Sequence, residues 1–299
     1  MKVLTIIGAR PQFVKAAVVS NALRKNEITE FLIHTGQHFD DNMSDIFFEE
    51  MGMVRPQVNL GVSGGNHGAM TGEMLIEVEK LIIEQKPDWV LVYGDTNSTL
   101  AGSLAASKLN IPCAHVEAGL RSDNRNMPEE INRILTDHAS DLLFAPTSTA
   151  HKRLLSEGIP QYKIVRTGDV MLDATLTFGK VAQEKSSIIK DLALEEQTFA
   201  LCTLHRAENV DRLETLEWIV GELNQVSKTI SLVLPLHPRT KAKFEQFSLF
   251  EKLSSSIKII GPVGFLDVLS LQQASNIIIT DSGGMQKEAF FQMKPCVTV

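Results

Sequence analysis

The sequence W-V-L-V-Y-G-D-T-N-S-T-L-A-G, residues 89–102, decides the fold because it joins a buried strand to a helix through a polar turn. Residues 89–93 form an apolar run that is too short for a helix and lies between a proline and a glycine, which is typical of a buried parallel strand. Asp95 follows the carboxyl end of this strand. Residues 96–99 favour a helix start, because their hydroxyl and amide groups can cap free backbone N–H groups. The stretch predicts a strand–turn–helix unit with a carboxylate at the turn.

The next strand and helix bring further acidic residues. Residues 113–116 form a second apolar run that ends at Glu117, and the sequence M-P-E-E-I-N-R places Glu129 and Glu130 on the first turn of the following helix. In an open parallel sheet, ligands bind at the carboxyl edge of the strands. We therefore expect Asp95, Glu117 and Glu129 to form an acid/base site at this edge.

Each of these carboxylates also has a structural interpretation. Asp95 can cap the helix that follows it, and Glu117 can pair with Arg121. Glu129 can pair with Arg133 at i,i+4 while its charge favours the helix dipole. Any one of these interpretations is reasonable, but three carboxylates at one sheet edge favour a functional site.

Length and composition describe an ordinary globular protein. The 299 residues suffice for two domains, and 43% of them are hydrophobic. A net charge of −7 argues against nucleic acid as a partner, because polyanion binders carry basic surfaces. No run reaches membrane-spanning length and the N-terminus lacks a signal-peptide pattern, so we expect a cytoplasmic protein.

The cysteines and histidines predict neither disulfides nor a metal site. The three cysteines lie in apolar, strand-like runs without a C-x-x-C pair, so we expect buried, reduced thiols at Cys113, Cys202 and Cys296. The eight histidines are scattered, and no H-E-x-x-H motif or Cys/His cluster occurs.

Strand and helix patterns alternate along the chain and predict two parallel-sheet α/β domains of Rossmann-like type, facing each other across a central cleft. The alternation is interrupted at V-R-T-G-D-V-M-L-D-A, and we place the domain boundary between residues 168 and 169. The chain ends inside a strand-like run, so we expect the second domain to be truncated. The expected strands are residues 3–7, 31–35, 89–93, 113–116, 142–145, 199–204, 232–236, 257–260 and 277–280; the main expected helices are one ending near Lys25 and residues 45–51, 69–85, 129–140, 148–158 and 213–228.

Three details of the first domain qualify this picture. The turn after the first strand reads G-A-R-P-Q-F-V-K and lacks the glycines of G-x-G-x-x-G, which disfavours a nicotinamide dehydrogenase. Lys15 lies on the apolar side of the helix that follows. It either extends its ammonium into solvent or supplies a cation to a site over the sheet edge. On the helix of residues 129–140, we expect His138 to be packed on an apolar face with Ile134 and Leu135.

The second domain carries cationic residues and a glycine turn after its strands. T-L-H-R-A-E-N places His205 and Arg206 at one strand end, and L-H-P-R places His237 and Arg239 at the next. The turn D-S-G-G frees backbone N–H groups at a helix start, which is either an ordinary helix cap or an anion site. A diphosphate needs charge-assisted hydrogen bonds as well, worth roughly 1.5–3 kcal/mol each. These cationic residues and Arg10 offer such bonds.

A carboxylate completes the pattern one helical turn further on. Glu288 follows Ser282, Gly283 and Gly284 and repels phosphate, but it can accept hydrogen bonds from two ribose hydroxyls. The combination of glycine turn and acidic residue favours a nucleotide.

The motifs resemble the non-hydrolysing UDP-N-acetylglucosamine 2-epimerase family over essentially the whole chain. They are G-A-R-P-Q-F-V-K, H-T-G-Q-H, G-D-T-N-S-T, H-V-E-A-G-L-R, P-E-E-I-N-R and D-S-G-G-M-Q-K-E. The resemblance implies a GT-B fold and a cytoplasmic, homodimeric isomerase of polysaccharide biosynthesis that acts on a UDP-sugar without a cofactor. The residues that match the family's catalytic or functional positions are Asp95, Glu117, Glu129, Lys15 and His205, and those that match its UDP-binding set are Arg10, Ser282, Gly283, Gly284 and Glu288.

The implied reaction fits the residue types. C2 of a pyranose has no acidic proton, so its inversion requires either transient oxidation or elimination. The family eliminates UDP across C1–C2 to give a glycal and adds it back with the opposite configuration at C2. Moving a proton on two faces of the sugar requires more than one acid/base group. The alternatives are a hydrolysing epimerase, a GT-B glycosyltransferase, or a nucleotide-sugar sensor without catalysis.

Two segments bear on substrate and regulation. The sequence S-D-N-R-N-M-P-E-E and the N-S-T after Asp95 resemble the branch that acts on UDP-2,3-diacetamido-glucuronic acid. Arg125 either faces the extra carboxylate of such a sugar or is a solvated loop residue. The aromatic–proline insertion of members that substrate activates at a second site is absent, so we expect no such activation.

Overall fold

The computed structural model describes residues 1–37, 48 and 50–299, and the side chain of Arg10 lies outside this description. Most of the helix expected at residues 45–51 also lies outside it. The chain divides into unit 1, Met1–Ala174, and unit 2, Thr175–Val299. The division falls inside α7 (Val170–Lys185), so this helix contributes residues to both units. Our boundary between residues 168 and 169 stays a prediction.

Unit 1 contains a seven-stranded parallel sheet in the order β3-β2-β1-β4-β5-β6-β7. Its strands are β1 (Lys2–Ile7), β2 (Thr29–His34), β3 (Val58–Asn59), β4 (Trp89–Tyr93), β5 (Cys113–Val116), β6 (Leu142–Ala145) and β7 (Ile164–Arg166). Because β4 pairs with both β1 and β5, the turns after these three strands lie side by side at the carboxyl edge.

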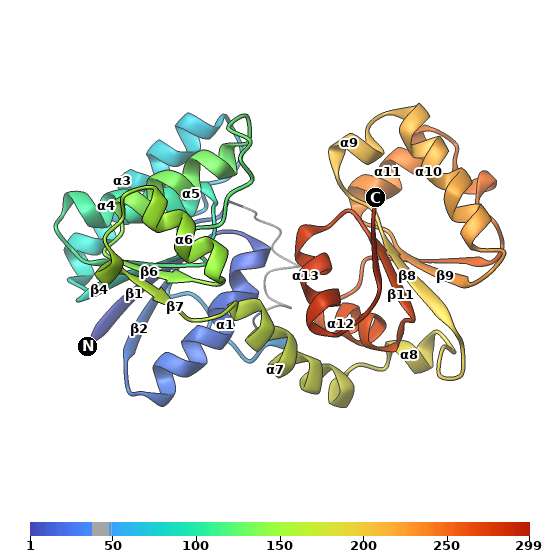
Figure 1. Cartoon of the computed structure of the whole chain (residues 1–299), viewed down its shortest axis with the longest axis horizontal. Coiled ribbons are helices and arrows are strands. Elements are labelled where there is room, and N and C mark those ends of the chain that lie inside the picture. The colour runs from blue at the N-terminus through green and yellow to red at the C-terminus, as the bar shows by residue number, and fades with distance from the viewer. Residues whose placement is uncertain (38–47, 49) are drawn as a thin grey trace. The chain divides into compact units, whose positions relative to one another are not determined.

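Helices cover both faces of this sheet (Figure 1). They are α1 (Arg10–Lys25), α3 (His67–Gln85), α4 (Asn97–Lys108), α5 (Pro128–Ala139) and α6 (Ser148–Ser156), with a short 3₁₀ helix at Gln161–Lys163. On one face α3 and α4 pack on Ile6, Val90 and Val92. On the other, Val19 and Leu23 of α1 line an apolar groove of about 380 Å³ over the strands.

Unit 2 contains a five-stranded parallel sheet in the order β10-β9-β8-β11-β12. Its strands are β8 (Phe199–Thr203), β9 (Ser231–Pro235), β10 (Ile257–Ile260), β11 (Ile277–Thr280) and β12 (Cys296–Thr298). Its helices are α8 (Ile188–Asp191), α9 (Ala207–Val210), α10 (Leu213–Val226), α11 (Pro238–Gln246), α12 (Phe265–Ala274) and α13 (Gly283–Phe291), with a 3₁₀ helix at Phe250–Lys252. The central strand β8 pairs with β9 and β11, so the turns after β8 and β11 are neighbours.

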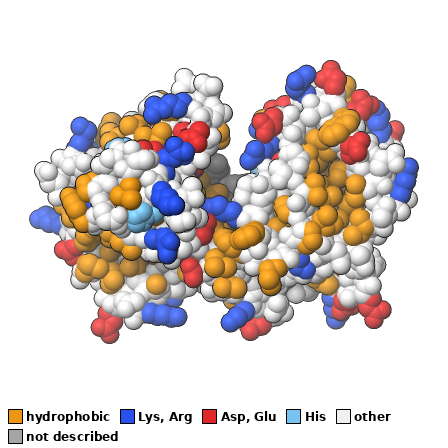
Figure 2. Space-filling view, viewed as in Figure 1, with side chains coloured by type: hydrophobic (Ala, Val, Ile, Leu, Met, Phe, Trp, Pro, Cys, Tyr) orange, Lys and Arg blue, Asp and Glu red, His pale blue; other side chains and the backbone are white. Residues whose placement is uncertain are grey.

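The two α/β domains predicted from the sequence are confirmed, with two corrections at the level of side chains. Cys113 and Cys202 are buried free thiols, and burial raises their pKa to about 12. Cys296, which we expected to be buried, is exposed because β12 is the edge strand of its sheet and all three of its residues are exposed. Figure 2 shows hydrophobic side chains gathered on the visible face of unit 2.

The second correction concerns α5. This helix buries a polar face that includes Glu130, Arg133 and Asp137, whereas Leu135 and His138 are exposed. Our expectation of a packed His138 was wrong, because the charged groups of α5 have buried partners at the strand ends.

Candidate active site

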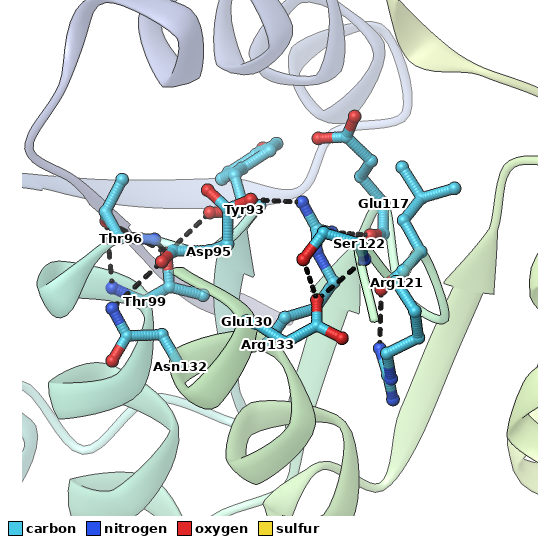
Figure 3. Close-up of polar contacts among 12 residues, drawn as sticks. Tyr93, Asp95, Thr96, Thr99, Glu117, Arg121, Ser122, Glu130, Asn132 and Arg133 are labelled. Atoms are coloured by element: carbon cyan, nitrogen blue, oxygen red, sulfur yellow. Dashed lines mark hydrogen bonds and ion pairs between the residues drawn. The ribbon is translucent and has the colours of Figure 1, made fainter. Parts of the chain in front are cut away.

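Asp95 and Arg133 form an ion pair at the carboxyl edge of the first sheet (Figure 3). Asp95 follows β4, and Arg133 projects from α5 to place Nη2 2.6 Å from Oδ2 of Asp95. Arg133 also donates through Nη1 to the backbone carbonyl of Glu117. Burial would lower the pKa of Arg133, but the charges of Asp95 and Glu117 outweigh it and raise the pKa. One buried guanidinium therefore connects the turns after β4 and β5.

Lys15 and Glu117 form a second ion pair at this edge, and both side chains are more than nine-tenths buried. Glu117 has a φ of +71°, a left-handed conformation that non-glycine residues adopt rarely and at an energetic cost. Gly94 lies against the pair: a Cβ at this position would be 3.6 Å from Oε2 of Glu117 and 3.9 Å from Nζ of Lys15. The left-handed backbone at Glu117 thus places a buried carboxylate in the turn next to that of Asp95, with Gly94 against it.

Gln12 fastens the turn after β1 to the turn after β4. Its side-chain oxygen accepts the backbone N–H groups of Gly8 and Ala9 at 2.7 and 3.0 Å. Its amide nitrogen donates to the carbonyl of Tyr93 at 2.7 Å and to the hydroxyl of Thr99 at 2.9 Å. This buried amide explains why α1, which carries Lys15, is fixed relative to β4.

The two glutamates at the start of α5 have different environments. Glu130 is buried and accepts the N–H and hydroxyl of Ser122 at 2.8 and 3.0 Å and the N–H of Asp123 at 3.1 Å. Burial would raise its pKa, but these hydrogen bonds lower it below its usual range. Glu130 therefore holds the 122–123 turn. Glu129 is exposed on the first turn of the helix, where its carboxylate is open to a ligand.

His115 and Asp137 tie α5 to the turns that flank the site. His115, on β5, places Nε2 2.7 Å from the carbonyl of Gly94 and Nδ1 2.7 Å from Oδ1 of Asp137. Asp137 also accepts the N–H of Gly119 at 3.1 Å and pairs with Arg121 at 2.7 Å. Burial would raise the pKa of Asp137, but the hydrogen bond from His115 and the charge of Arg121 hold it below its usual range. Gly94, which precedes Asp95, is thus connected to α5 through His115, and Gly119, two residues after Glu117, is connected to α5 directly.

In unit 2, His205 and Asp281 come together where β8 and β11 end. The Asp281 side chain is fully buried, and its Oδ1 lies 3.1 Å from Nδ1 of His205. His205 itself is 43% exposed, and its ring lies 6.1 Å from that of His237, centroid to centroid. The imidazole is therefore held on one side and open on the other.

The glycine turn of unit 2 forms the N-terminus of α13. Ser282 is the N-cap, and its Oγ accepts the N–H of Met285 at 3.4 Å. Arg206 lies beside this turn, because a Cβ on Gly283 would be 3.9 Å from its Nη2. A helix N-terminus with an adjacent guanidinium can bind an anion through backbone N–H groups and a charge-assisted contact.

Three further nucleotide-binding candidates of unit 2 have structural partners. Glu288 is buried, and its Oε2 accepts Nε2 of Gln272 at 2.7 Å. His237 is the N-cap of α11, and its Nδ1 accepts the N–H of Arg239 at 3.3 Å. Arg239 forms an ion pair with Asp211. These contacts orient the three side chains.

The structure decides between the alternatives for the unit 1 residues. Lys15 is buried against Glu117, so the solvent-extended interpretation was wrong. Arg121 pairs with Asp137 and Glu157 and not with Glu117, and Arg133 pairs with Asp95 and not with Glu129. The catalytic and UDP-binding roles stay predictions, and that of Arg10 concerns a side chain outside the described residues.

Sequence reasoning missed the residues that position the candidates. Asp137 and Asp281 gave no signal, because their partners are far away in the sequence. His115 did offer one: a histidine between two apolar residues of a buried strand needs polar partners. In the part of the chain that the structure describes, no three His, Cys, Asp or Glu side chains are grouped as metal ligands, and no helix is long and apolar enough to cross a membrane.

The family model of UDP-N-acetylglucosamine 2-epimerase matches residues 21–299. The UDP-2,3-diacetamido-2,3-dideoxy-D-glucuronate 2-epimerase of Pseudomonas aeruginosa is 55% identical over 100% of this chain and 83% of its own length.

Two solved structures agree with the whole chain. The UDP-GlcNAc 2-epimerase of Methanocaldococcus jannaschii in complex with UDP-GlcNAc and UDP is 48% identical, with a TM-score of 0.90 over 100% of this chain and 83% of that one. The UDP-GlcNAc 2-epimerase of Neisseria meningitidis bound to UDP-GlcNAc is 34% identical, with a TM-score of 0.88 over 100% and 82%. Both are GT-B-like two-domain proteins, which confirms the predicted fold class.

Proposed function

The chain belongs to the UDP-N-acetylglucosamine 2-epimerase family, and we propose that it is an isomerase that inverts C2 of a 2-acetamido sugar carried on UDP. The observation that carries this proposal is the pair of carboxylates at adjacent strand ends. Asp95 is held by Arg133, and Glu117 is held by Lys15. Two fixed acid/base groups are what proton removal from one face of C2 and proton return to the other require.

The proposed reaction is an elimination followed by an addition. A carboxylate takes the proton at C2, the electron pair of the C2–H bond forms a C1–C2 double bond, and the C1–O bond breaks so that UDP leaves with its electron pair. The opposite sequence then delivers a proton to the other face of C2, and UDP adds back at C1. Atoms and electrons balance without an oxidant, so no external cofactor is consumed.

The residues of each unit have distinct tasks in this proposal. Lys15 and Arg133 hold Glu117 and Asp95 in place through ion pairs, and Glu129 is a third acid/base group on the exposed first turn of α5. In unit 2, the N-terminus of α13 and Arg206 stabilise the charge of the departing diphosphate, since preorganised donors act where charge develops. His205 exchanges a proton with the reacting groups, and Glu288 accepts ribose hydroxyls.

NMR of the full chain in D₂O tests the function. We expect deuterium at C2 of both substrate and product when the protein is incubated with UDP-N-acetylglucosamine or its 2,3-diacetamido-glucuronate analogue. Asp95→Asn and Glu117→Gln should abolish exchange while UDP still binds, and Lys80→Met, on the exposed side of α3, is the control. Free UDP in proportion to turnover would instead indicate a hydrolysing epimerase, dependence on an acceptor a glycosyltransferase, and binding without exchange a sensor.

For the substrate, we propose that the 2,3-diacetamido-glucuronate is preferred, because the Pseudomonas enzyme named for it shares 55% identity and the two structures named for UDP-GlcNAc share 48% and 34%. Arg125 is exposed on the 122–127 segment and can meet the carboxylate at C6. Arg125→Met should then lower kcat/KM for the glucuronate and leave that for UDP-N-acetylglucosamine unchanged. An equal effect on both would contradict this role. A homodimer and a cytoplasmic location stay predictions.

A further inference from the structure

Asp281 is surrounded by hydrogen-bond donors that come from the other strand end. Its Oδ2 accepts the backbone N–H groups of His205 and Arg206 at 3.0 and 2.9 Å and the Nδ2 of Asn209 at 3.1 Å. Its Oδ1 accepts the N–H of His205 at 3.2 Å and faces Nδ1 of the same residue at 3.1 Å. The two oxygens therefore differ in their contacts: Oδ2 holds the turn after β8 in place, and Oδ1 is the oxygen that contacts the imidazole.

These contacts determine the protonation state of Asp281. Burial would raise the pKa of the carboxyl, but the hydrogen bonds from His205, Arg206 and Asn209 lower it far below its usual range. The backbone N–H groups of His205 and Arg206 and the side-chain amide of Asn209 donate to the carboxyl in either tautomer of His205, and they stabilise its ionised form. Asp281 is consequently an acceptor at both oxygens.

An acceptor at Oδ1 fixes the imidazole of His205. A neutral imidazole carries one N–H, and hydrogen bonding at one ring nitrogen decides which nitrogen has it. Because Oδ1 can only accept, Nδ1 carries the hydrogen and Nε2 keeps the lone pair. Nε2 can then take up a proton while the Nδ1–H bond remains, and the carboxylate stabilises the imidazolium that forms.

We propose that Asp281 is a positioning residue that holds His205 as the Nδ1–H tautomer and thereby makes Nε2 its proton-transferring atom. Asp281 also directly precedes Ser282, the N-cap of α13, so one buried side chain connects the histidine to the proposed diphosphate turn. The role of Nε2 in proton transfer rests on the proposed function, whereas the tautomer itself follows from contacts within unit 2.

Asp281→Asn separates positioning from mere structural support. Three donors converge on Oδ2, so the amide oxygen of the substituted side chain should take that place and retain the turn. The NH₂ group then occupies the place of Oδ1 and donates to Nδ1 of His205, which forces the Nε2–H tautomer. In the Ser-His-Asp triad of a serine protease, a matching Asp→Asn change lowers kcat by about 10⁴ through the wrong tautomer.

The experiment is long-range ¹H–¹⁵N NMR of the full chain labelled with ¹⁵N-histidine, with His205→Gln to assign the signals. The wild-type chain should show the Nδ1–H tautomer at His205, and Asp281→Asn should show Nε2–H. With either UDP-sugar, kcat should fall by about 10²-fold or more while KM stays within about threefold. The matched control is Asp191→Asn, the same change at an exposed carboxylate of unit 2 that accepts the hydroxyl of Ser187. The tautomer of His205 and kcat should stay as in the wild type.

Two results would overturn the proposal: an Nε2–H tautomer in the wild-type chain, or a swapped tautomer in Asp281→Asn with unchanged kcat. If Asp281→Asn does not fold, the wild-type signals still decide the tautomer, and Asp281→Glu tests whether a displaced carboxylate lowers kcat. If the protein epimerises neither UDP-sugar, the proposed function fails, whereas the NMR signals still confirm or contradict the assignment of Nδ1–H.

Discussion

Lys15 and Glu117 form a buried ion pair although 102 residues separate them in the sequence. Lys15 comes from the second turn of α1 and Glu117 from the turn after β5, and the strand order β1-β4-β5 brings the two elements together. Removing two charges from water costs several kcal/mol per ion, which a single attraction only partly offsets. A pair of this kind is weak support for stability, and we infer that it is retained for the carboxylate it holds.

Lys15→Met should destabilise the fold, because it leaves the carboxylate of Glu117 buried without the ammonium. We expect the free energy of unfolding, measured by urea denaturation, to fall by about 3 kcal/mol. The double variant Lys15→Met with Glu117→Gln should regain part of this loss. Lys80→Met, which breaks the exposed pair with Glu77, should change stability by less than about 0.5 kcal/mol. Equal losses in both lysine variants would contradict the buried pair.

Gly94→Ala should reduce activity by straining the backbone directly before Asp95. Gly94 has a φ of +66°, so an added Cβ costs about 1–2 kcal/mol in the backbone, whereas its contact with Oε2 of Glu117 at 3.6 Å would be an ordinary van der Waals contact. Gly158→Ala is the matched control, because Gly158 has a φ of +86° and open space around the same position. Both variants should lose similar stability in thermal melts, and only Gly94→Ala should lower kcat. A loss of kcat in both variants would show that strain next to Asp95 has no specific effect on catalysis.

Local patterns sufficed to predict most of the fold. The strands at residues 89–93, 113–116, 142–145, 257–260 and 277–280 have the predicted bounds, because short apolar runs between turn residues leave few alternatives. The short strands β3 and β7 were missed, since two or three residues carry no period, whereas the strand-like run expected at the end of the chain is β12.

The side-chain partners were less predictable. Proximity in sequence suggested that Arg121 pairs with Glu117 and Arg133 with Glu129, but the strand order supplies Lys15 and Asp95 as the actual partners. The left-handed backbone of Glu117 is equally invisible in sequence, because only tertiary contacts make a non-glycine residue adopt it. Residue types predicted the chemistry of the site, and long-range pairing decided its geometry.

Arg133→Lys should impair catalysis although it preserves the charge. Arg133 donates through two nitrogens in different directions, to Oδ2 of Asp95 and to the carbonyl of Glu117, and a lysine has one ammonium for both. We expect kcat to fall by about 10²-fold, since small misplacements of catalytic groups have effects of this size. Arg153→Lys, in an exposed pair with Asp123, should leave kcat unchanged. If kcat of Arg133→Lys equals that of the wild type, catalysis requires only a positive charge beside Asp95 and not the two hydrogen bonds of the guanidinium.

Asp137→Asn should change how stability depends on pH. The pKa of Asp137 is lowered from 3.8 in the folded protein, so its contribution to stability is fully present above about pH 4 and is lost as the pH falls through the folded-state pKa. At pH 7 the variant should lose about 3–5 kcal/mol, because Arg121 and His115 lose a buried partner. The difference in free energy of unfolding between the variant and the wild type, measured by urea denaturation, should become smaller as the pH is lowered from about 5 to about 2. Asp123→Asn, at an exposed position, should follow the wild type throughout; a difference for Asp137→Asn that stays constant with pH would contradict the lowered pKa.

Arg206→Met tests the anion site of unit 2. Nη2 of Arg206 lies beside the N-terminus of α13, and its other terminal nitrogen is 3.3 Å from Glu208 in an exposed pair. A charge-assisted hydrogen bond to phosphate contributes roughly 1.5–3 kcal/mol, so we expect the Kd for UDP, measured by calorimetry, to rise by at least about tenfold. Arg212→Met removes a similar charge at an exposed position, the N-cap of α10, and should bind UDP like the wild type. If both variants raise the Kd for UDP equally, UDP binding depends on the overall positive charge of unit 2 and not on a contact at the α13 turn.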